Sequence, residues 1–288
     1  MSKISKLGMG IVAFDDVTHI KNMCAEIRDV VDVIVVCLQN KSYFGIDIEP
    51  EIVTYIETLK GDGFIDDVMW FDGKDYGNSN EAPRLTETDK RNAILDKLEY
   101  EYNCSHSIIT DSDEFYSHDE FLNAKNTIDN IDVVATYCQY INYYRDYKHV
   151  LVWPYKAYVP FITQSNYRFD FKKGNFDKPS DPTRRYVLNE GDNYSVLPFS
   201  LVKMHHLSWI RINIESKIDN WSSKRYFQDV KGLRERIIDR YNNYQNGQNA
   251  ILMFGTPDNE VIVNVLPQQY INPKYSLIDG CRNMCDGN

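Results

Sequence analysis

The chain has 288 residues, of which 43% are hydrophobic and 26% are charged, a composition typical of a soluble globular protein. Its 32 basic and 42 acidic residues give a net charge of -10, so overall charge does not favour binding to nucleic acid or to an anionic membrane. No apolar run approaches the length of a membrane span, and no signal peptide is evident, so we expect a cytoplasmic protein.

Six cysteines are spread along the chain without Cys-x-x-Cys spacing. Cys24, Cys37, Cys104 and Cys138 stand among apolar residues, which is typical of buried free thiols in a reducing compartment. The remaining two lie near the C-terminus with no histidine close by. A zinc cluster is therefore not expected.

The N-terminal segment alternates between strand and helix patterns. Residues 7–14 and 32–39 are apolar runs of the kind that form buried parallel strands. Between them, residues 19–31 place Ile20, Met23 and Ile27 at helical spacing. This is the pattern of a βαβ unit, whose two strands are parallel neighbours in one sheet.

The alternation continues along the chain. The expected elements are a helix at 51–60, a strand at 65–71, a loop at 72–87 rich in Gly, Asn and Pro, a helix at 90–102, and a strand at 107–110. A helix that begins at residue 90 would put Arg91 and Asn92 in its first turn, where backbone N–H groups and a cation can meet a phosphate.

The second half of the chain is less regular. We expect a helix at 118–127, strands at 133–141 and 201–211, helices at 212–221 and 223–243, and late apolar runs at 251–255 and 261–265. Residues 143–194 are dense in aromatic side chains, which either stack on sugar rings or bases or cover the sheet. Their number favours the second interpretation.

The most distinctive motif follows the strand at 107–110. Asp111 and Asp113 are separated by one residue at a strand exit, where ligands bind in α/β sheets. Two such carboxylates can face one Mg²⁺ or Mn²⁺ ion that bridges to a diphosphate. The alternative is an acidic turn that ends a strand in solvent.

Two adjacent histidines, His205 and His206, lie in the expected strand at 201–211. Neighbouring residues of a strand point to opposite faces, so one imidazole would enter a site while the other faces away. The alternative is that both are structural or exposed.

The segment from Thr110 to Tyr116, preceded by Lys90-Arg91-Asn92 and followed by residues 204–211, resembles the nucleotide-sugar glycosyltransferases of the GT-A fold. It is most similar to small members found in bacteria and their phages, and the resemblance covers roughly residues 8–211. It implies an α/β, Rossmann-like sandwich with a mostly parallel central sheet. The expected domains are a catalytic domain at 1–211 and a helical extension at 212–288.

The resemblance also implies roles for residues that match the motifs. Asp113 would bind Mn²⁺ or Mg²⁺ directly, and Asp111 would contact the metal through water or the ribose of a nucleotide sugar, in particular a UDP-linked donor. His206, with His205 as the alternative, would complete the metal site. Phe14, Asp15 and Asp16 would hold the base and ribose, and Arg91 would contact the donor.

The reaction implied is transfer of the sugar to an acceptor hydroxyl. Arg91 or Arg211 would stabilise the departing diphosphate, and a carboxylate base would assist an inverting reaction. The chain lacks an unmistakable Glu-Asp base motif, and we expect Glu190 or Asp192, in a polar turn before the histidines, to serve instead.

The acceptors of similar enzymes include polysaccharides and, in phages, hydroxymethylated DNA bases. Basic residues near the aromatic segment would serve a DNA acceptor, or form a solvated loop; they are Lys172, Lys173, Lys178, Arg184 and Arg185. Two other functions compete with glycosyl transfer: a nucleotide- or carbohydrate-binding protein without catalysis, and a metal-dependent phosphoesterase or nuclease. The concentration of acids in one motif disfavours the nuclease.

Overall fold

The structure is a computed structural model that describes residues 3–152, 156–211, 213–221, 224, 231–252 and 260–265. It divides into two compact units. The first unit consists of Met1–Tyr140 and Lys156–Met204, and the second of Ile141–Tyr155 and His205–Asn288. The division thus comes earlier than the expected boundary at residue 211, and it assigns an internal segment to the second unit.

The strands and helices of the first unit alternate up to β4. They are β1 (Leu7–Val12), α1 (Ile20–Ile27), β2 (Val33–Leu38), α2 (Pro50–Gly61), β3 (Asp67–Trp70), α3 (Ala82–Asp96) with a π-helical turn η1 (Lys97–Glu101), β4 (His106–Asp111), β5 (Glu114–Phe115), α4 (His118–Ile128), β8 (Tyr158–Gln164), a 3₁₀ turn η2 (Pro182–Arg184) and β9 (Tyr194–Val196). Two strands, β6 (Ala135–Tyr144) and β10 (Lys203–Trp209), begin in the first unit and end in the second.

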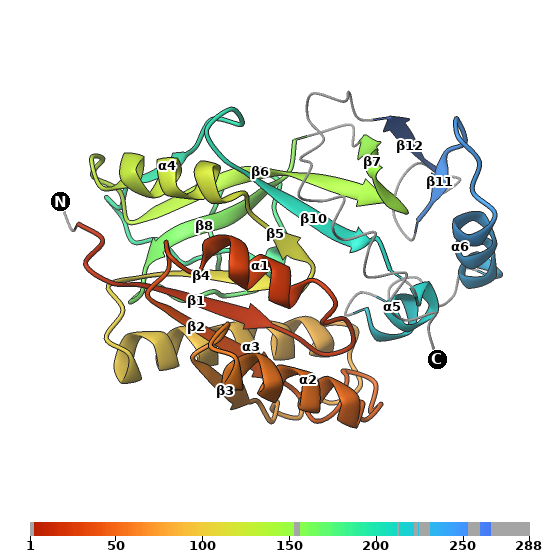
Figure 1. Cartoon of the computed structure of the whole chain (residues 1–288), viewed down its shortest axis with the longest axis horizontal. Helices are drawn as coiled ribbons and strands as arrows, with labels where there is room; N and C mark the ends of the chain where they lie inside the picture. Colours follow the sequence, from red (N-terminus) through yellow and green to blue (C-terminus); the bar gives the residue numbers. More distant parts are fainter. Residues whose placement is uncertain are drawn as a thin grey trace. The chain divides into compact units, whose positions relative to one another are not determined.

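Four parallel strands form the centre of the first unit in the order β4-β1-β2-β3, and β8 joins β4 in antiparallel orientation. Figure 1 shows β1 between β4 and β2. Since βαβ crossovers are right-handed, α1 and α2 cover one face, and α3, which returns the chain from β3 to β4, covers the other. The prediction of an α/β fold with a parallel centre is confirmed.

Glycines in β1 allow α3 to pack unusually close to the sheet. A Cβ atom on Gly10 would lie 2.2 Å from Cγ2 of Ile94, and one on Gly8 would lie 2.8 Å from Sγ of Cys104. Side chains at these positions would hold the helix away from the strand. The sequence Leu7-Gly8-Met9-Gly10 therefore fixes the distance between the sheet and the helix that carries Arg91.

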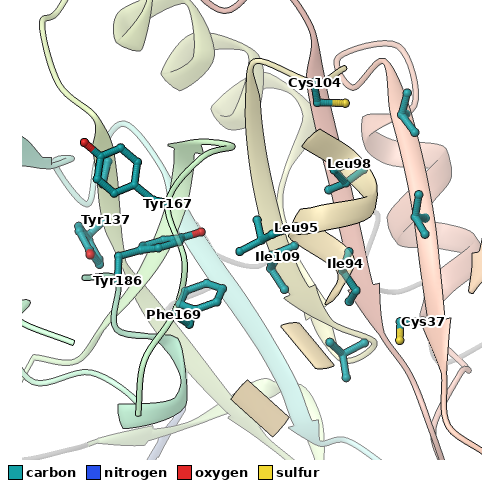
Figure 2. Packing of buried hydrophobic residues seen from close by; sticks show 14 of the residues in the cluster. Cys37, Ile94, Leu95, Leu98, Cys104, Ile109, Tyr137, Tyr167, Phe169 and Tyr186 are labelled. Carbon is teal, nitrogen blue, oxygen red and sulfur yellow. The ribbon is translucent and has the colours of Figure 1, made fainter. Parts of the chain in front are cut away.

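The core beneath α3 is one continuous cluster. Figure 2 shows Ile94, Leu95 and Leu98 beside Ile109 of β4, and all four side chains are buried. Phe169 and Tyr186 belong to the same cluster, and their rings stack at 4.1 Å between centroids. These aromatics thus cover the sheet, as their number indicated, while Trp153 and Tyr155 lie outside the described residues.

The second unit contains its own small core. Its remaining elements are β7 (Asp146–Val152), α5 (Ile214–Asn220), α6 (Leu233–Asn242), β11 (Ala250–Ile251) and β12 (Glu260–Val265). Strand β12 pairs antiparallel with both β11 and β7. Ile214, Ile237 and Leu252 are among the buried residues of this core. Among the described residues, no helix is both long enough and apolar enough to cross a membrane.

The largest difference from the predicted elements is the start of α3. The helix begins at Ala82 rather than at residue 90, so the last part of the expected loop, residues 82–87, is helical. Pro83 lies in its first turn, where a proline costs no hydrogen bond and favours helix initiation. Arg91 and Asn92 consequently lie well inside the helix, and the prediction that they begin it is wrong.

Candidate functional site

The carboxyl ends of β1 and β4 lie next to each other in the first unit. Val12 pairs with Asp111 in the parallel ladder, and the backbone N–H of Ser112 donates to the carbonyl of Val12 at 3.0 Å. The loop after β1 and the acidic turn after β4 therefore start from the same edge of the sheet. In parallel α/β sheets, this edge is where ligands bind.

Two arginines hold the carboxylate of Asp111. Arg91 donates from Nη1 to Oδ1 at 2.8 Å and from Nη2 to Oδ2 at 3.2 Å, and Arg184 donates from Nη2 to Oδ2. The Arg91 side chain has no exposed surface, and that of Arg184 is 5% exposed. Since both oxygens of Asp111 accept from guanidinium groups, these hydrogen bonds fix the orientation of the carboxylate.

Glu114 and Glu87 complete the buried ion cluster. Arg184 donates to both carboxylate oxygens of Glu114, at 2.8 and 2.7 Å, and Glu114 accepts the backbone N–H of Asp111 at 3.0 Å. Arg91 donates to Glu87, one helical turn earlier, at 2.5 Å. We call these five residues, Glu87, Arg91, Asp111, Glu114 and Arg184, the buried ion cluster, in which the side chain of Asp111 is 29% exposed and the other four are nearly covered.

The cluster keeps Asp111 ionised. Burial alone would raise the pKa of this carboxyl, but the charges of Arg184 and Arg91 outweigh that effect, and its pKa lies well below the ordinary value. Removing one member of such a cluster leaves an uncompensated charge in the protein interior. The geometry of the acidic turn and the stability of the unit are therefore linked.

Asp113, the second acid of the motif, lies in the same turn and is 5% exposed. The turn thus contains Asp111, which accepts from two arginines, and Asp113, which is two residues further along the chain and is buried.

Arg91 and Asn92 have structural partners. The guanidinium of Arg91 is enclosed by Asp111 and Glu87, and the amide of Asn92 both donates to the carbonyl of Phe169 and accepts its N–H, at 2.9 and 2.8 Å. Asn92 therefore fastens the aromatic segment to α3. A direct contact between Arg91 and a donor stays a prediction.

A buried lysine at the same edge was not anticipated from the sequence. Lys90 is 2% exposed and donates from Nζ to Oε1 of Gln39, which follows β2, at 2.7 Å. Its ammonium also lies 5.2 Å from the ring centroid of Tyr43. Burial lowers the pKa of Lys90. Its position beside Arg91 carried no signal of burial, since adjacent residues of a helix do not share a face.

The loop after β1 holds the three residues expected to bind base and ribose. Phe14 and Asp15 are half-buried, and Asp16 is buried. Asp16 accepts the backbone N–H of Thr18 at 3.1 Å, which forms a tight turn before α1. Their role in binding stays a prediction, although the loop starts at the edge that carries Asp111.

Glu190 and Asp192 do not lie at this edge. They precede β9, whose Tyr194 pairs with Ala135, while Ala135 pairs with Thr163 and Thr163 with Ser107. Ser107 is at the start of β4, and at about 3.3 Å per residue Asp111 is on the order of 13 Å further along the strand. This register places both acids toward the opposite edge, and we do not retain them as candidates for the catalytic base.

The remaining predicted residues belong to the second unit. Nδ1 of His206 lies 2.6 Å from Oδ1 of Asn142, within hydrogen-bond distance. His205 is buried and bonds the Tyr143 hydroxyl at 2.8 Å, and Nε of Arg211 donates to the carbonyl of Ser208 at 3.2 Å.

The residues present do not form a complete metal site by themselves. Among the described residues, no three His, Cys, Asp or Glu side chains are grouped so that they could hold a metal ion. Carboxylate oxygens have the right chemistry for Mg²⁺ or Mn²⁺, but those of Asp111 are engaged by arginines. The set Asp111, Asp113 and His206 stays a prediction.

The basic residues considered for a DNA acceptor are mostly paired. Arg184 belongs to the buried ion cluster, Lys172 lies 3.1 Å from Glu81, and Lys178 lies 3.4 Å from Asp177. Arg185 bonds Ser180. These pairs offset the positive charge that a phosphate-binding surface needs.

No family model matches the chain, and no curated protein is significantly similar to it in sequence. Partial structural likenesses exist to GalNAc-T7 with UDP, GalNAc and Mn²⁺ (TM-score 0.44, 11% identity, 85% of this chain and 52% of that one) and to S. aureus TarS (0.42, 10%, 84% and 44%). A third is to TarS 1-349 in complex with UDP-GlcNAc (0.34, 12%, 48% and 35%). The chain thus spans between 35 and 52% of the length of these three proteins, and likenesses of this size assign no family.

Proposed function

We propose that the chain is a glycosyltransferase that moves a sugar from a nucleoside-diphosphate donor, in particular a UDP-linked one, to an acceptor hydroxyl. The observation that carries the proposal is the register of Val12 with Asp111. It brings the loop with Asp15 and Asp16 and the Asp-x-Asp turn to the same edge of a parallel sheet. A donor nucleotide bound across these strand ends would contact both.

The buried ion cluster supports a defined role for Asp111. Because Arg91 and Arg184 keep it ionised and oriented, it is suited to accept hydrogen bonds from ribose hydroxyls on every turnover. Arg91 and Arg184 then act as positioning residues, since both are buried and their guanidinium groups hold Asp111. This role differs from the direct donor contact expected for Arg91.

We propose that Asp113, the second acid of the Asp-x-Asp motif, coordinates the metal directly, while both oxygens of Asp111 accept from arginines. Mg²⁺ and Mn²⁺ are commonly held by one or two carboxylates together with substrate phosphates, so we expect the metal to bind with the diphosphate. Bound there, it would neutralise the charge of the leaving group. A ligand role for His206 stays a prediction.

For the acceptor, we propose a glycan hydroxyl in preference to a modified DNA base. The net charge is -10, and Lys172 and Lys178 are paired with acids. A DNA acceptor would require unpaired cations along its backbone.

The proposal is tested by incubating the protein with a panel of UDP-, GDP- and dTDP-sugars and Mn²⁺, and by measuring release of the free nucleoside diphosphate. We expect release from one donor class, increased by a suitable glycan acceptor and abolished in Asp113→Asn. Donor binding without release would instead indicate a binding protein without catalysis. Cleavage of plasmid DNA without any sugar donor would replace the proposal with a nuclease.

A further inference from the structure

The first unit has a concave surface beside α2. It is an open hollow of about 810 Å³ between α2 and the ends of β2 and β3. The residues that line it are Asn40, Ile48, Pro50, Val53, Thr54, Glu57, Thr58 and Trp70. We call this surface the Trp70 hollow.

Trp70 is the most informative residue of the hollow. It ends β3, the edge strand of the parallel sheet, and it is 41% exposed. Its neighbour Met69 packs against the core beneath α3, so strand alternation turns Trp70 to the face covered by α2. The indole lies beside Ile48, Pro50 and Val53, so this side of the hollow is apolar.

Polar groups surround the indole on the helix side. Positions 50, 53, 54, 57 and 58 of α2 recur at helical spacing and so share one face. The hydroxyls of Thr54 and Thr58 donate to helix carbonyls at 3.1 and 2.8 Å, which leaves their oxygens able to accept. Asn40, held by a 2.9 Å hydrogen bond to Asp72, stands on the strand side.

The charge of the hollow limits its ligand. Among the described residues that line it, Glu57 alone is charged, so a phosphate or another anion would be repelled. A flat apolar surface with acceptor groups at its border suits a ring that has apolar C–H faces and hydroxyl donors at its edge. A neutral sugar has this chemistry, whereas a nucleotide does not.

We propose that the Trp70 hollow is a binding site for a neutral saccharide, with one sugar ring stacked on Trp70 and its hydroxyls donating to Glu57 and to the threonine oxygens. The site lies at the sheet edge formed by β3, which β1 and β2 separate from β4 in the order β4-β1-β2-β3. It does not require the proposed transfer reaction, and it binds saccharide without a nucleotide donor.

The test uses the full chain labelled with 5-fluorotryptophan, which gives one ¹⁹F resonance for each of the four tryptophans. The Trp70→Phe variant identifies the resonance of Trp70. Methyl glycosides of glucose, galactose and mannose, and N-acetylglucosamine, are then titrated without nucleotide or metal. We expect a saturable shift of the Trp70 resonance by at least one of these sugars, while that of Trp209, which is 4% exposed, stays in place.

A matched variant separates the polar contacts from stacking. Glu57→Ala should weaken binding roughly tenfold, the usual effect of losing a hydrogen bond to a charged group, whereas Glu51→Ala, on α2 but outside the lining, should not. The proposal is overturned if no sugar shifts Trp70, if all four resonances shift together, or if Trp70 shifts with protein concentration alone, which would indicate self-association. Because no donor is present, each of these results is independent of the transfer assay.

Discussion

Arg184 and Glu114 are joined by a two-point ion pair, with Nη1 of the arginine 2.8 Å from Oε2 and Nη2 2.7 Å from Oε1. Both side chains are at most 5% exposed. Arg184 ends the turn η2, and Glu114 begins β5 directly after the acidic motif. The pair therefore fastens a distant segment of the chain to the turn that holds Asp111 and Asp113.

Replacing Arg184 should destabilise the protein strongly. Arg184→Ala leaves Glu114 and Asp111 with fewer cations in the interior, and loss of one partner of a buried pair costs about 3–5 kcal/mol. Arg184→Lys should recover part of this, because an ammonium keeps the charge but cannot form both bonds. Urea unfolding measures the free energy of unfolding of each variant.

Arg185→Ala is the matched control, since that side chain is half-buried and bonds Ser180. A loss of unfolding free energy in Arg185→Ala equal to that in Arg184→Ala would contradict the role of the cluster.

The two acids of the motif should separate in mutational tests. Asp111→Asn removes the charge that Arg91 and Arg184 share, so both the unfolding free energy and sugar transfer should fall. Asp113→Asn should abolish transfer and lower the unfolding free energy less than Asp111→Asn does, because two buried arginines pair with Asp111. Parallel measurement of thermal unfolding and nucleotide release distinguishes them. Equal destabilisation by both variants would show that Asp113 also serves the core.

Gly10 should not tolerate a side chain. The Cβ of Gly10→Ala would lie 2.2 Å from Ile94 and 2.7 Å from Ile109, and overpacking of this kind costs about 1–3 kcal/mol. Because Ile94 lies one turn after Arg91, the shift should also weaken transfer. Gly61→Ala, at the end of α2 with no atom within 4 Å of its Cβ, is the control. Equal urea midpoints for the two variants would contradict the close approach of α3.

How far the sequence predicts this protein depends on the range of the interactions. Buried parallel strands such as β2 were predictable, because each is a continuous apolar run. The start of α3 was missed because the Gly, Asn and Pro content of residues 72–87 was interpreted as a loop, although Pro83 is also typical of the first turn of a helix. The pair between Arg184 and Asp111 spans 73 residues, and its members were interpreted separately, as a surface cation and a ligand. No local pattern links them.

The location of the acids proposed as the base was missed for a similar reason. Glu190 and Asp192 precede the histidine segment in sequence, but their location depends on the register of β9 with β6. Register follows from which faces of neighbouring strands are buried together, and a three-residue strand such as β9 carries too little of that pattern.

His118 should make stability depend on pH. Its hydrogen bonds to Asp119, at 2.8 Å, and to Asp29, at 3.1 Å, raise its pKa above the ordinary value of about 6.5. A raised folded-state pKa gives stabilisation that is complete below pH about 6.5 and is lost as the pH rises through the folded value. His118→Gln should therefore be less stable than the parent below that pH, by under about 1 kcal/mol because the pairs are exposed.

Urea unfolding across that pH range measures the difference, which should disappear under alkaline conditions. Asp29→Asn should reproduce part of the effect, since it removes one of the two carboxylate partners. A His118→Gln deficit that is the same at every pH would contradict a charge-based contribution.

Removal of metal should abolish transfer and leave the fold unchanged. Within the described residues no three ligands are grouped to hold a metal ion, and both oxygens of Asp111 are engaged, so the chain alone should bind Mn²⁺ weakly. UDP should increase Mn²⁺ affinity, because its phosphates supply the remaining oxygen ligands. Mn²⁺ electron paramagnetic resonance, with and without UDP, measures this affinity directly, and thermal unfolding after EDTA treatment should show no loss of stability.

Asp113→Asn should remove the UDP-dependent Mn²⁺ binding. Tight Mn²⁺ binding without nucleotide, or full transfer in EDTA, would contradict the metal assignment while leaving the donor site at the edge of β1 and β4 open to test by UDP binding.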